Sequence, residues 1–453
     1  MCSQPVQRAS VGCVSNTQRG NGPTSFYTDH YELTMVDAAR KAGTADRKAV
    51  FELFARRLPT GRRYGVSAGQ GRFLEGLADF RFDDDHLGFL SDHHVVSEDT
   101  LNWLSQYRFT GDIYAYAEGE PYFPHSPIMQ VEATFAEAVV LETYLLSVHN
   151  YDTAVASAAS RMTRAAGGRP CIEMGSRRAH EEAAVAAARA AAIAGFDSTS
   201  NLAAGLRYGI TTAGTAAHSF TLLHDDERSA FQAQVDAMGR QTSLLVDTYD
   251  IETGIRNAVE VAGPELAAIR IDSGDLLEEA HHARRLLDDL GNTNTGIVVT
   301  SDLDEYAIAG LRSAPVDSYG VGTQLVTGSG APTASLVYKL TTREDAHGNW
   351  VDVEKEAKGK ASRGGRKYAA RRMVDGVAAA EVVVTGGEPS WDPNHRPLLS
   401  KVVDQGVIDT AHTGPSAVTA AAARHHQAVR ELPPSARRLQ DGEPAIPTEF
   451  ELH

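Results

Sequence analysis

The sequence predicts an α/β protein that combines an irregular, TIM-like α/β barrel with a discontinuous α/β sandwich domain. With 453 residues, the chain exceeds the size at which single hydrophobic cores stop growing, so two or more domains are expected. Its middle part alternates short apolar runs with longer helical patterns, which is typical of βαβ units and a parallel sheet. Strands and helices are mixed on both sides of that part, which indicates a second domain made from both ends of the chain.

These shifts in pattern predict four parts. Residues 1–23 are rich in Ser, Gln, Asn and Gly and lack the apolar core of a signal peptide, so we expect a disordered N-terminal tail. Residues 24–135 form the first part of the sandwich domain, and residues 136–333 form the barrel. Residues 334–453 return to the sandwich as its second part and end in a C-terminal tail.

In the first sandwich part, the spacing of apolar residues predicts a helix over 31–42 that ends at Gly43. A strand is expected over 49–54, followed by a turn at 58–61 that contains Pro and Gly. A long helical pattern begins at Ala136 and opens the barrel.

Within the barrel, strands are expected over 171–174, 211–213 and 243–246, with helices over 181–194 and 230–238. Four apolar runs then end in polar clusters: runs 244–246, 268–271, 296–299 and 318–321 are followed by clusters 247–250, 272–275, 300–302 and 322–324. In an α/β barrel, polar residues at the carboxyl ends of strands line the active site. A structural loop is not expected to repeat that chemistry, so the repetition favours a barrel enzyme.

Composition and charge restrict the partners. A hydrophobic fraction of 42% is ordinary for a globular protein, and no apolar run approaches the roughly 20 residues of a membrane span. A formal net charge of −16 argues against sequence-independent binding of nucleic acid. The three cysteines have neither a metal-ligand spacing nor an even disulfide framework. We therefore expect a cytoplasmic protein with no membrane or nucleic-acid partner.

The most informative segment is 214–220, in which His218 stands among small residues beside two hydroxyl side chains. A neutral imidazole is one of the few nucleophiles available near neutral pH, because its ordinary pKa is about 6.5. The small neighbours leave it accessible to a phosphate donor. Alone, however, a histidine is more often a hydrogen-bonded structural residue, so the interpretation depends on the other motifs.

Six segments occur in the order expected of one family: TDHYELTM at 28–35, EMGSRRAH at 173–180, GTAAHSF at 214–220, VDTYD at 246–250, RIDSGDL at 270–276 and YGVGTQL at 319–325. With these motifs the chain, from about residue 24 to about residue 439, resembles the nicotinate phosphoribosyltransferase family. Those enzymes attach phosphoribose to nicotinate in NAD salvage. Agreement of six motifs in order is implausible by chance.

The resemblance implies an ATP-dependent, ligase-type reaction. Nicotinate and 5-phosphoribosyl 1-pyrophosphate (PRPP) would condense to nicotinate mononucleotide and pyrophosphate, while ATP becomes ADP and phosphate. His218 would be the residue that ATP phosphorylates. The family also implies Mg²⁺ as a cofactor and a homodimer with shared active sites.

For nicotinate, the resemblance points to an aromatic face and a guanidinium, because Arg can hold a carboxylate by two parallel hydrogen bonds. Tyr31 is expected to reach the ring from the neighbouring subunit, and Arg270 to bind the carboxylate. The remaining candidates near the ring are Thr215, Ser219 and Met174. Without the motifs, Tyr31 reads as a core aromatic residue and Arg270 as part of a strand-end ion pair.

For the ribose and pyrophosphate of PRPP, the resemblance points to acidic and basic side chains. Asp272 is expected to accept hydrogen bonds from the ribose hydroxyls, and Arg177 and Arg178 to balance the pyrophosphate. Asp275 is a second carboxylate, for hydroxyls or Mg²⁺.

The 5-phosphate of PRPP requires backbone amides that side chains do not obstruct, which glycine permits. Gly320, Gly322 and Thr323 follow a late strand, where barrels commonly bind phosphate. Ser301 and Asp302 follow the preceding strand and complete this group.

Three alternatives remain open from the sequence. A nicotinamide phosphoribosyltransferase would take the uncharged amide in place of the acid. A barrel glycosidase would use Asp272 and Asp302 as paired carboxylates. A degenerate barrel that only senses a phosphorylated metabolite is the third. The basic segment 356–372 has no assigned role; it could contact phosphate or form a solvated hairpin.

Overall fold

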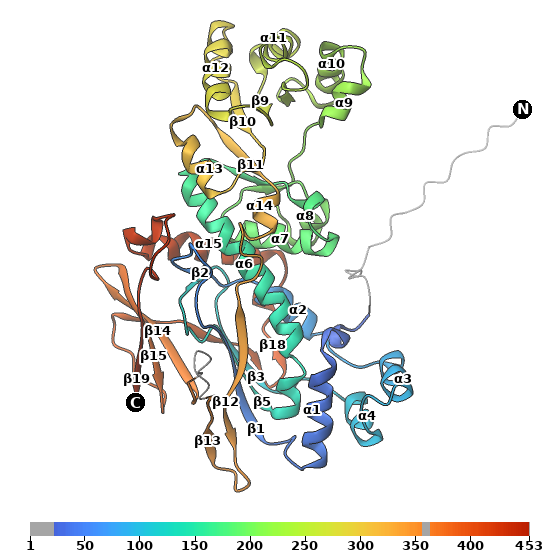
Figure 1. Cartoon of the computed structure of the whole chain (residues 1–453), viewed down its shortest axis with the longest axis vertical. Helices are drawn as coiled ribbons and strands as arrows, with labels where there is room; N and C mark the ends of the chain where they lie inside the picture. Colours follow the sequence, from blue (N-terminus) through green and yellow to red (C-terminus); the bar gives the residue numbers. More distant parts are fainter. Residues whose placement is uncertain (1–21, 356–362, 453) are drawn as a thin grey trace, which may run out of the picture.

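The computed structural model describes residues 22–355 and 363–452 (Figure 1). The tail predicted over residues 1–23 therefore lies outside the described residues except for its last two positions. Most of the first half of the basic segment 356–372 is also outside them. No helix in the described ranges is both long enough and apolar enough to span a bilayer.

Strands from both ends of the chain share a seven-stranded sheet. Its interior strand β1 (Lys48–Ala55) is almost entirely buried and pairs antiparallel with β12 on one side and β5 on the other. The order is β13-β12-β1-β5-β3-β17-β18. The other strands are β3 (Asp112–Tyr116), β5 (Met129–Thr134), β12 (Leu336–Glu344), β13 (Trp350–Asp352), β17 (Leu399–Asp404) and β18 (Val407–Ile408). The sandwich is discontinuous in sequence, as predicted.

A second, four-stranded sheet has the order β16-β14-β15-β19. Its strands are β14 (Lys367–Val374), β15 (Val377–Thr385), β16 (His395–Pro397) and β19 (Thr448–Leu452). Asp375 and Gly376 join β14 to β15 with φ values of 50° and 78°. Two central residues with positive φ are typical of a type I′ hairpin turn, whose twist matches that of the strands. A short pair, β2 (Gly65–Val66) and β4 (Pro121–Tyr122), accompanies these two sheets.

The long helix α6 (Glu142–Ala166) connects the sandwich to the rest of the molecule (Figure 1). It follows the short α5 (Phe135–Val139), which Thr134 caps, and it ends at Gly167 in the left-handed region. The helix packs against β12 in the sandwich and against α7 and α13 of the parallel α/β part. Because both sides cover it, most of its residues are buried, and it works as a shared core element.

The middle of the chain forms a six-stranded parallel sheet of order β7-β6-β11-β10-β9-β8. The strands are β6 (Cys171–Glu173), β7 (Ser198–Thr199), β8 (Ser243–Leu245), β9 (Ala268–Ile271), β10 (Gly296–Val299) and β11 (Ser318–Val321). Within the described residues β7 and β8 are the two edges, so the sheet is a curled half-barrel that does not close. The predicted α/β class and barrel-like sheet are confirmed.

The prediction of a strand over residues 211–213 is wrong. The segment makes one parallel bridge, between Thr212 and Thr199 of β7. Thr211 and Thr212 are exposed, so no apolar face holds the segment in the sheet. The chain instead leaves the sheet edge at this point and continues to α9.

Helices surround both parts of the molecule. The sandwich carries α1 (His30–Lys41), α2 (Gln70–Leu77), α3 (Asp84–Asp92) and α4 (Glu98–Ser105), while α15 (Gly414–Glu431) packs against α7 and α8. The parallel part carries α7 (Glu181–Ile193), α8 (Leu202–Tyr208), α9 (His218–Leu223), α10 (Glu227–Met238), α11 (Ile251–Ala262), α12 (Leu276–Asp289), α13 (Glu305–Gly310) and α14 (Thr323–Val326). Helices α9 to α12 gather at one end of the molecule, and α1 lies toward the other (Figure 1).

Candidate active site

The carboxyl ends of β6 and of β9 to β11 carry most of the residues predicted for the site. Since parallel strands end at the same edge of a sheet, residues far apart in sequence meet there. His218 joins them from outside the sheet, as the first residue of α9.

The His218 imidazole lies between a hydroxyl and two carboxylates. Nδ1 is 3.1 Å from the Thr248 hydroxyl. Nε2 lies 3.8 Å from Asp247 Oδ1 and 4.0 Å from Asp272 Oδ2. The side chain is 39% exposed, so a ligand can reach it from solvent while the ring keeps a defined orientation.

Asp247 is a site residue to which the sequence analysis assigned no role. Its side chain is buried, and Oδ2 accepts hydrogen bonds from the Asp272 backbone amide at 2.9 Å and from the Ser273 hydroxyl at 2.7 Å. Oδ1 is buried with no hydrogen-bond partner in the described residues and faces His218. A buried carboxylate oxygen without a donor is costly, which indicates that it serves the histidine or a ligand. The signal was present in the sequence: Asp247 directly follows an apolar run, as Asp272 does.

Asp272 is held by the neighbouring strand. The Thr300 hydroxyl at the end of β10 donates a short hydrogen bond to Asp272 Oδ1, while Oδ2 faces His218. Asp247, Asp272 and Thr300 therefore tie together the ends of β8, β9 and β10. This arrangement places two carboxylates beside one imidazole.

Arg270 lies on β9 and donates a hydrogen bond from Nη1 to the Thr215 hydroxyl at 3.3 Å. Its Nε is buried with no partner in the described residues. Burial lowers the pKa of the guanidinium, Asp272 and Asp247 oppose this, and Arg177 adds to the lowering. No described carboxylate lies within 4.0 Å of Arg270, so the guanidinium keeps donors for a ligand. Thr215 and Arg270 are brought together, as expected of two residues that bind one group.

Arg177 and Arg178 lie in the short 3-10 helix Ser176–Arg178 after β6, and both are exposed. The fully buried Glu173 fixes the start of this segment. Its Oε1 accepts the Gly175 amide, and its Oε2 accepts the Thr199 hydroxyl, both at 2.5 Å. The arginines can therefore reach an anion from a rigid loop.

Close packing at β11 depends on glycine. A Cβ at Gly320 would clash with the Thr300 methyl group and lie 2.8 Å from Met174 Sδ. One at Gly322 would lie 3.3 Å from the Met174 carbonyl. The Met174 amide donates to the Val321 carbonyl at 2.8 Å, which locks the two strand ends together. Met174 thus lies between β6 and β11.

Ser301 and Asp302 follow β10 and are exposed. Ser301 has a φ of 138°, a conformation that residues other than glycine rarely adopt. Such strain clusters at functional sites, where the surrounding structure enforces it. Gly322 and Thr323 follow β11, and Thr323 begins α14.

Two predicted residues differ from the rest in position. Ser219 is exposed beside His218 on α9. Tyr31 lies on α1, at the far end of the same chain from the strand ends (Figure 1). It is 47% exposed, and burial together with Glu142 and Glu32 raises its pKa to about 12. The structure therefore does not bring Tyr31 and the other site residues together within one chain.

Part of the acidic repetition at the strand ends is structural. Asp250, Asp275 and Asp304 are the N-caps of α11, α12 and α13, and each accepts backbone amides of the following helix. Carboxylates are favoured there because the first amides of a helix have no partner within it. The inference that structural loops have no reason to repeat this chemistry is wrong for Asp250 and Asp275, which belong to the predicted polar clusters, while Asp304 lies just after the third cluster. Asp247 and Asp272 are not caps, and they face His218.

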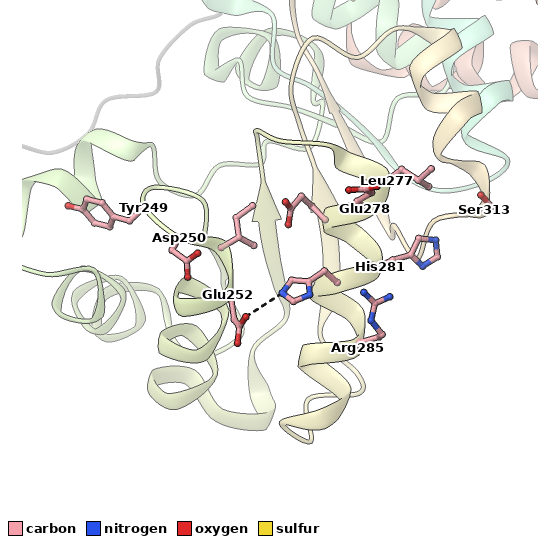
Figure 2. Close-up of a pocket in the computed structure, with 11 residues that line it drawn as sticks. Tyr249, Asp250, Glu252, Leu277, Glu278, His281, Arg285 and Ser313 are labelled. Atoms are coloured by element: carbon pink, nitrogen blue, oxygen red, sulfur yellow. Dashed lines mark ion pairs between the residues drawn. The ribbon is translucent and has the colours of Figure 1, made fainter.

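A cavity of about 960 Å³ lies beside this region, between the starts of α11 and α12 (Figure 2). Its lining includes Tyr249, Glu252, His281 and Arg285, and Glu252 Oε2 lies 3.8 Å from His282 Nε2. None of the predicted site residues lines it. The cavity neighbours the strand-end site and is distinct from it.

These features define a class of α/β protein in which a half-barrel, packed on a discontinuous sandwich, gathers an arginine and carboxylates at its strand ends beside a histidine. A family model for the nicotinate phosphoribosyltransferase N-terminal domain matches residues 26–150. The chain is 54% identical to nicotinate phosphoribosyltransferase pncB1 of Mycobacterium tuberculosis over 439 residues, which cover 94% of this chain and 95% of that protein. The chain belongs to the nicotinate phosphoribosyltransferase family and is an enzyme of that type.

Other relatives agree. A nicotinate phosphoribosyltransferase of Bacillus subtilis is 40% identical, covering 73% of this chain and 69% of that protein. The crystal structure of human nicotinic acid phosphoribosyltransferase matches with a TM-score of 0.78 and 26% identity, covering 94% and 97% of the two chains. A nicotinate-nucleotide pyrophosphorylase from Pyrococcus furiosus shares the fold, with a TM-score of 0.74, 23% identity and coverage of 90% and 96%.

The packing at β11 yields a prediction. Gly320→Ala forces Thr300 and Met174 apart, and we expect a loss of about 1–3 kcal/mol in the free energy of unfolding, as for other overpacked sites. Because Thr300 also orients Asp272, turnover should fall as well. Urea denaturation and initial rates measure both effects. Gly88→Ala is the matched control, since nothing lies within 4 Å of its added Cβ on helix α3; equal effects of both substitutions would contradict the packing argument.

Proposed function

We propose that this enzyme condenses nicotinate with PRPP to nicotinate mononucleotide and pyrophosphate, and couples the reaction to hydrolysis of ATP. This is the first step of NAD biosynthesis from nicotinate. The names of its relatives support the substrates. The observation that carries the proposal is the imidazole of His218, oriented by Thr248 and two carboxylates and reachable from solvent.

His218 is the phosphoryl acceptor in this proposal. If Nδ1–H donates to Thr248, the lone pair of Nε2 is free to attack the γ-phosphorus of ATP. The N–P bond forms, the bond from phosphorus to the bridging oxygen breaks, and ADP leaves. Water later cleaves the N–P bond and releases phosphate. The carboxylates of Asp247 and Asp272 favour the positive charge that develops on the ring.

Nicotinate binds through its carboxylate. Arg270 supports this role because it is a partly buried guanidinium whose Nε has no protein partner. Thr215 binds the same carboxylate through its hydroxyl, which accepts a hydrogen bond from Arg270. Met174 and Ser219 border the ring. A charge-assisted pair in a partly desolvated place discriminates the acid from the neutral amide.

PRPP binds across the strand ends. Arg177 and Arg178 balance its pyrophosphate, and Asp272 accepts hydrogen bonds from the ribose hydroxyls. The 5-phosphate lies against two segments, 301–302 and 320–323, which we call the phosphate segments. The nicotinate nitrogen forms a bond to the anomeric carbon as the bond from that carbon to the pyrophosphate oxygen breaks. The reaction therefore needs charge stabilisation more than a protein nucleophile.

Mg²⁺ fits the donor chemistry of this edge. The ion prefers carboxylate oxygens and keeps several waters, using one or two carboxylates together with substrate phosphates. In the part of the chain that the structure describes, no group of three or more His, Cys, Asp or Glu could hold a metal ion. Asp272, and Asp275 through the oxygen that its helix cap does not use, would hold it jointly with pyrophosphate. The ion would neutralise charge on the leaving group.

A homodimer with shared sites is part of the proposal. Tyr31 cannot serve the site of its own chain, because α1 lies far from it (Figure 1). Leu222 and Leu223 on α9 are 61% and 78% exposed, next to His218. Leu202 and Leu206 on α8 are also exposed. These exposed leucines, near a site that Tyr31 of the same chain cannot reach, support a dimer in which a second copy of the chain covers them.

The proposed function is tested by product formation from nicotinate, PRPP and Mg²⁺, with and without ATP, followed by chromatography. We expect nicotinate mononucleotide, in an amount that rises when ATP is added. A parallel reaction with nicotinamide tests the amide alternative. Product from nicotinamide alone would transfer the assignment to that substrate, and no product from either would contradict the proposed activity.

Replacing the nucleophile separates energy coupling from group transfer. His218→Ala should abolish ATP hydrolysis and leave slow, ATP-independent formation of nicotinate mononucleotide. The readouts are ADP release and trapping of radiolabelled phosphate on the protein. Ser219→Ala, one residue along the same helix, should still become phosphorylated. ATP hydrolysis at the wild-type rate in His218→Ala would remove this residue from the role.

Replacing Arg270, the proposed partner of the nicotinate carboxylate, should weaken nicotinate binding selectively. Arg270→Ala is expected to raise the KM for nicotinate roughly 10- to 150-fold. This corresponds to a loss of about 1.5–3 kcal/mol of binding free energy, the range for a hydrogen bond to a charged group. The KM for PRPP should change far less. An unaltered KM for nicotinate would show that another residue binds the carboxylate.

Shared sites predict complementation between inactive chains. Tyr31→Ala and His218→Ala each damage one half of the site, so a mixed dimer contains one intact site. Mixing the two variants after partial unfolding and refolding should restore ATP-coupled activity toward about a quarter of the wild-type value, if chains pair at random. Activity equal to the mean of the separate variants would contradict a shared site.

A further inference from the structure

A single buried carboxylate joins four distant parts of the chain. Glu305, the first residue of α13, has a side chain that is 1% exposed. Its Oε1 accepts hydrogen bonds from Arg62 Nη1 at 2.9 Å and from Arg161 Nε at 2.8 Å. Its Oε2 accepts the Ser329 hydroxyl at 2.5 Å. Arg62 comes from the sandwich, Arg161 from α6, and Ser329 from the loop after α14.

The loop that contains Ser329 is strained. Gly328, Ser329 and Gly330 are consecutive residues in the left-handed region, with φ values of 68°, 49° and 81°. A serine there is unfavourable unless other contacts enforce it. Besides the bond to Glu305, Arg62 Nη2 donates to the Gly328 carbonyl at 2.7 Å, and the Ser329 amide donates to the Gln324 carbonyl at 2.6 Å. These contacts hold the loop against its local preference.

Two members of this cluster, Glu305 and Ser329, each follow one of the phosphate segments within a few residues. Segment 301–302 precedes Glu305 by a few residues, and Ser301 is itself strained. Segment 320–323 leads into α14, and the Ser329 amide bonds back to Gln324 in that helix. The two oxygens of Glu305 therefore fix the chain that leaves β10 relative to the chain that leaves β11.

The cluster also connects the phosphate segments to the sandwich and to α6. Arg161 Nη1 donates to the Gly61 carbonyl at 2.5 Å, and Nη2 donates to the Leu439 carbonyl at 3.1 Å. Burial alone would raise the pKa of the Glu305 carboxyl, but the Ser329 hydroxyl, Arg62 and Arg161 outweigh it and hold the pKa below its ordinary value. The carboxylate stays charged, and its loss would leave two buried guanidinium groups uncompensated.

We propose that Glu305 is a positioning residue for PRPP, which acts through Ser329 to hold the two phosphate segments at the spacing that one phosphate requires. This inference rests on the proposed function, because it takes the 5-phosphate of PRPP as the ligand of those segments. Glu305 is too deeply buried to touch substrate. Its effect on the reaction is on binding geometry, and a displacement of about 1 Å in such a site is costly.

The test compares two variants with a matched control. Ser329→Ala removes the hydrogen bond between the loop and Glu305, and it keeps the Arg62 and Arg161 ion pairs and the bond from Arg62 to the Gly328 carbonyl. Glu305→Gln keeps the shape of the side chain and one acceptor oxygen, but it removes the charge and turns the other oxygen position into a donor. The control is Glu381→Gln, because Glu381 is as deeply buried and accepts from Arg371 Nη2 at 2.7 Å and from Tyr116 at 2.8 Å, within the sandwich. Steady-state kinetics in both substrates, thermal unfolding, and calorimetric titration with PRPP are measured for each.

We expect Ser329→Ala to raise the KM and the Kd for PRPP about tenfold, equivalent to about 1.4 kcal/mol, with the KM for nicotinate within about twofold of wild type. Glu305→Gln should do the same or more and lower the melting temperature. Glu381→Gln should lower the melting temperature without changing the KM for PRPP.

Two results would overturn the inference. If Ser329→Ala leaves the KM and the Kd for PRPP unchanged while the wild type binds PRPP, the cluster has no positioning role and the proposed function stands. If Glu381→Gln raises the KM for PRPP as much as Ser329→Ala does, the effect is a general consequence of lower stability. A wild-type enzyme that neither binds PRPP nor forms mononucleotide would refute the proposed function itself, and with it this inference.

Discussion

Burial of the helix α6 is the constraint on which the rest of the structure depends. Its 25 residues include sixteen that are buried, among them Asp152, His149 and Arg161, so water cannot cover it on either side. The chain must place one domain against each face, and it does so by leaving the sandwich after β5 and returning to it at β12, which pairs with β1. The discontinuous sandwich and the half-barrel therefore each cover one side of this helix, which carries both apolar and charged side chains.

Three buried charged groups on this shared core form ion pairs with other elements. Asp152 on α6 pairs with Arg72 of α2 at 2.6 Å, and Arg161 pairs with Glu305 of α13. On the neighbouring α7, the fully buried Arg189 pairs with Glu118 at 2.5 Å. Such pairs add little net stability over apolar packing, but an arrangement that separates the two partners leaves a buried charge uncompensated, which is expensive. The domains consequently meet at a single relative position, and the strand-end site inherits that accuracy.

The sequence predicted those features that local chemistry controls. Apolar runs placed β8 to β11 within a residue of their observed ends, and the polar clusters after them located the site, because strand ends in a parallel sheet converge. Residues 211–213 were predicted as a strand and form one bridge, since short-range pattern does not reveal whether a sheet edge is available. Part of the acidic signal was capping, because Asp250 and Asp275 in the predicted clusters serve helix starts. Which carboxylate faces His218 depends on how β8 and β9 align, so Asp247 could not be separated from Asp250 by sequence alone.

The residues around His218 differ in how firmly the fold holds them. Asp247 and Asp272 are fixed at strand ends by a backbone amide and by the hydroxyls of Ser273 and Thr300. His218 is held differently: it begins a short, partly exposed helix outside the sheet, and among the described residues its side chain hydrogen-bonds to Thr248. A change of charge on the imidazole therefore acts on the partner with the fewest fixed contacts. Asp247 and Asp272 are anchored at the strand ends by their own hydrogen bonds, whereas His218 is positioned together with α9, the helix that it begins.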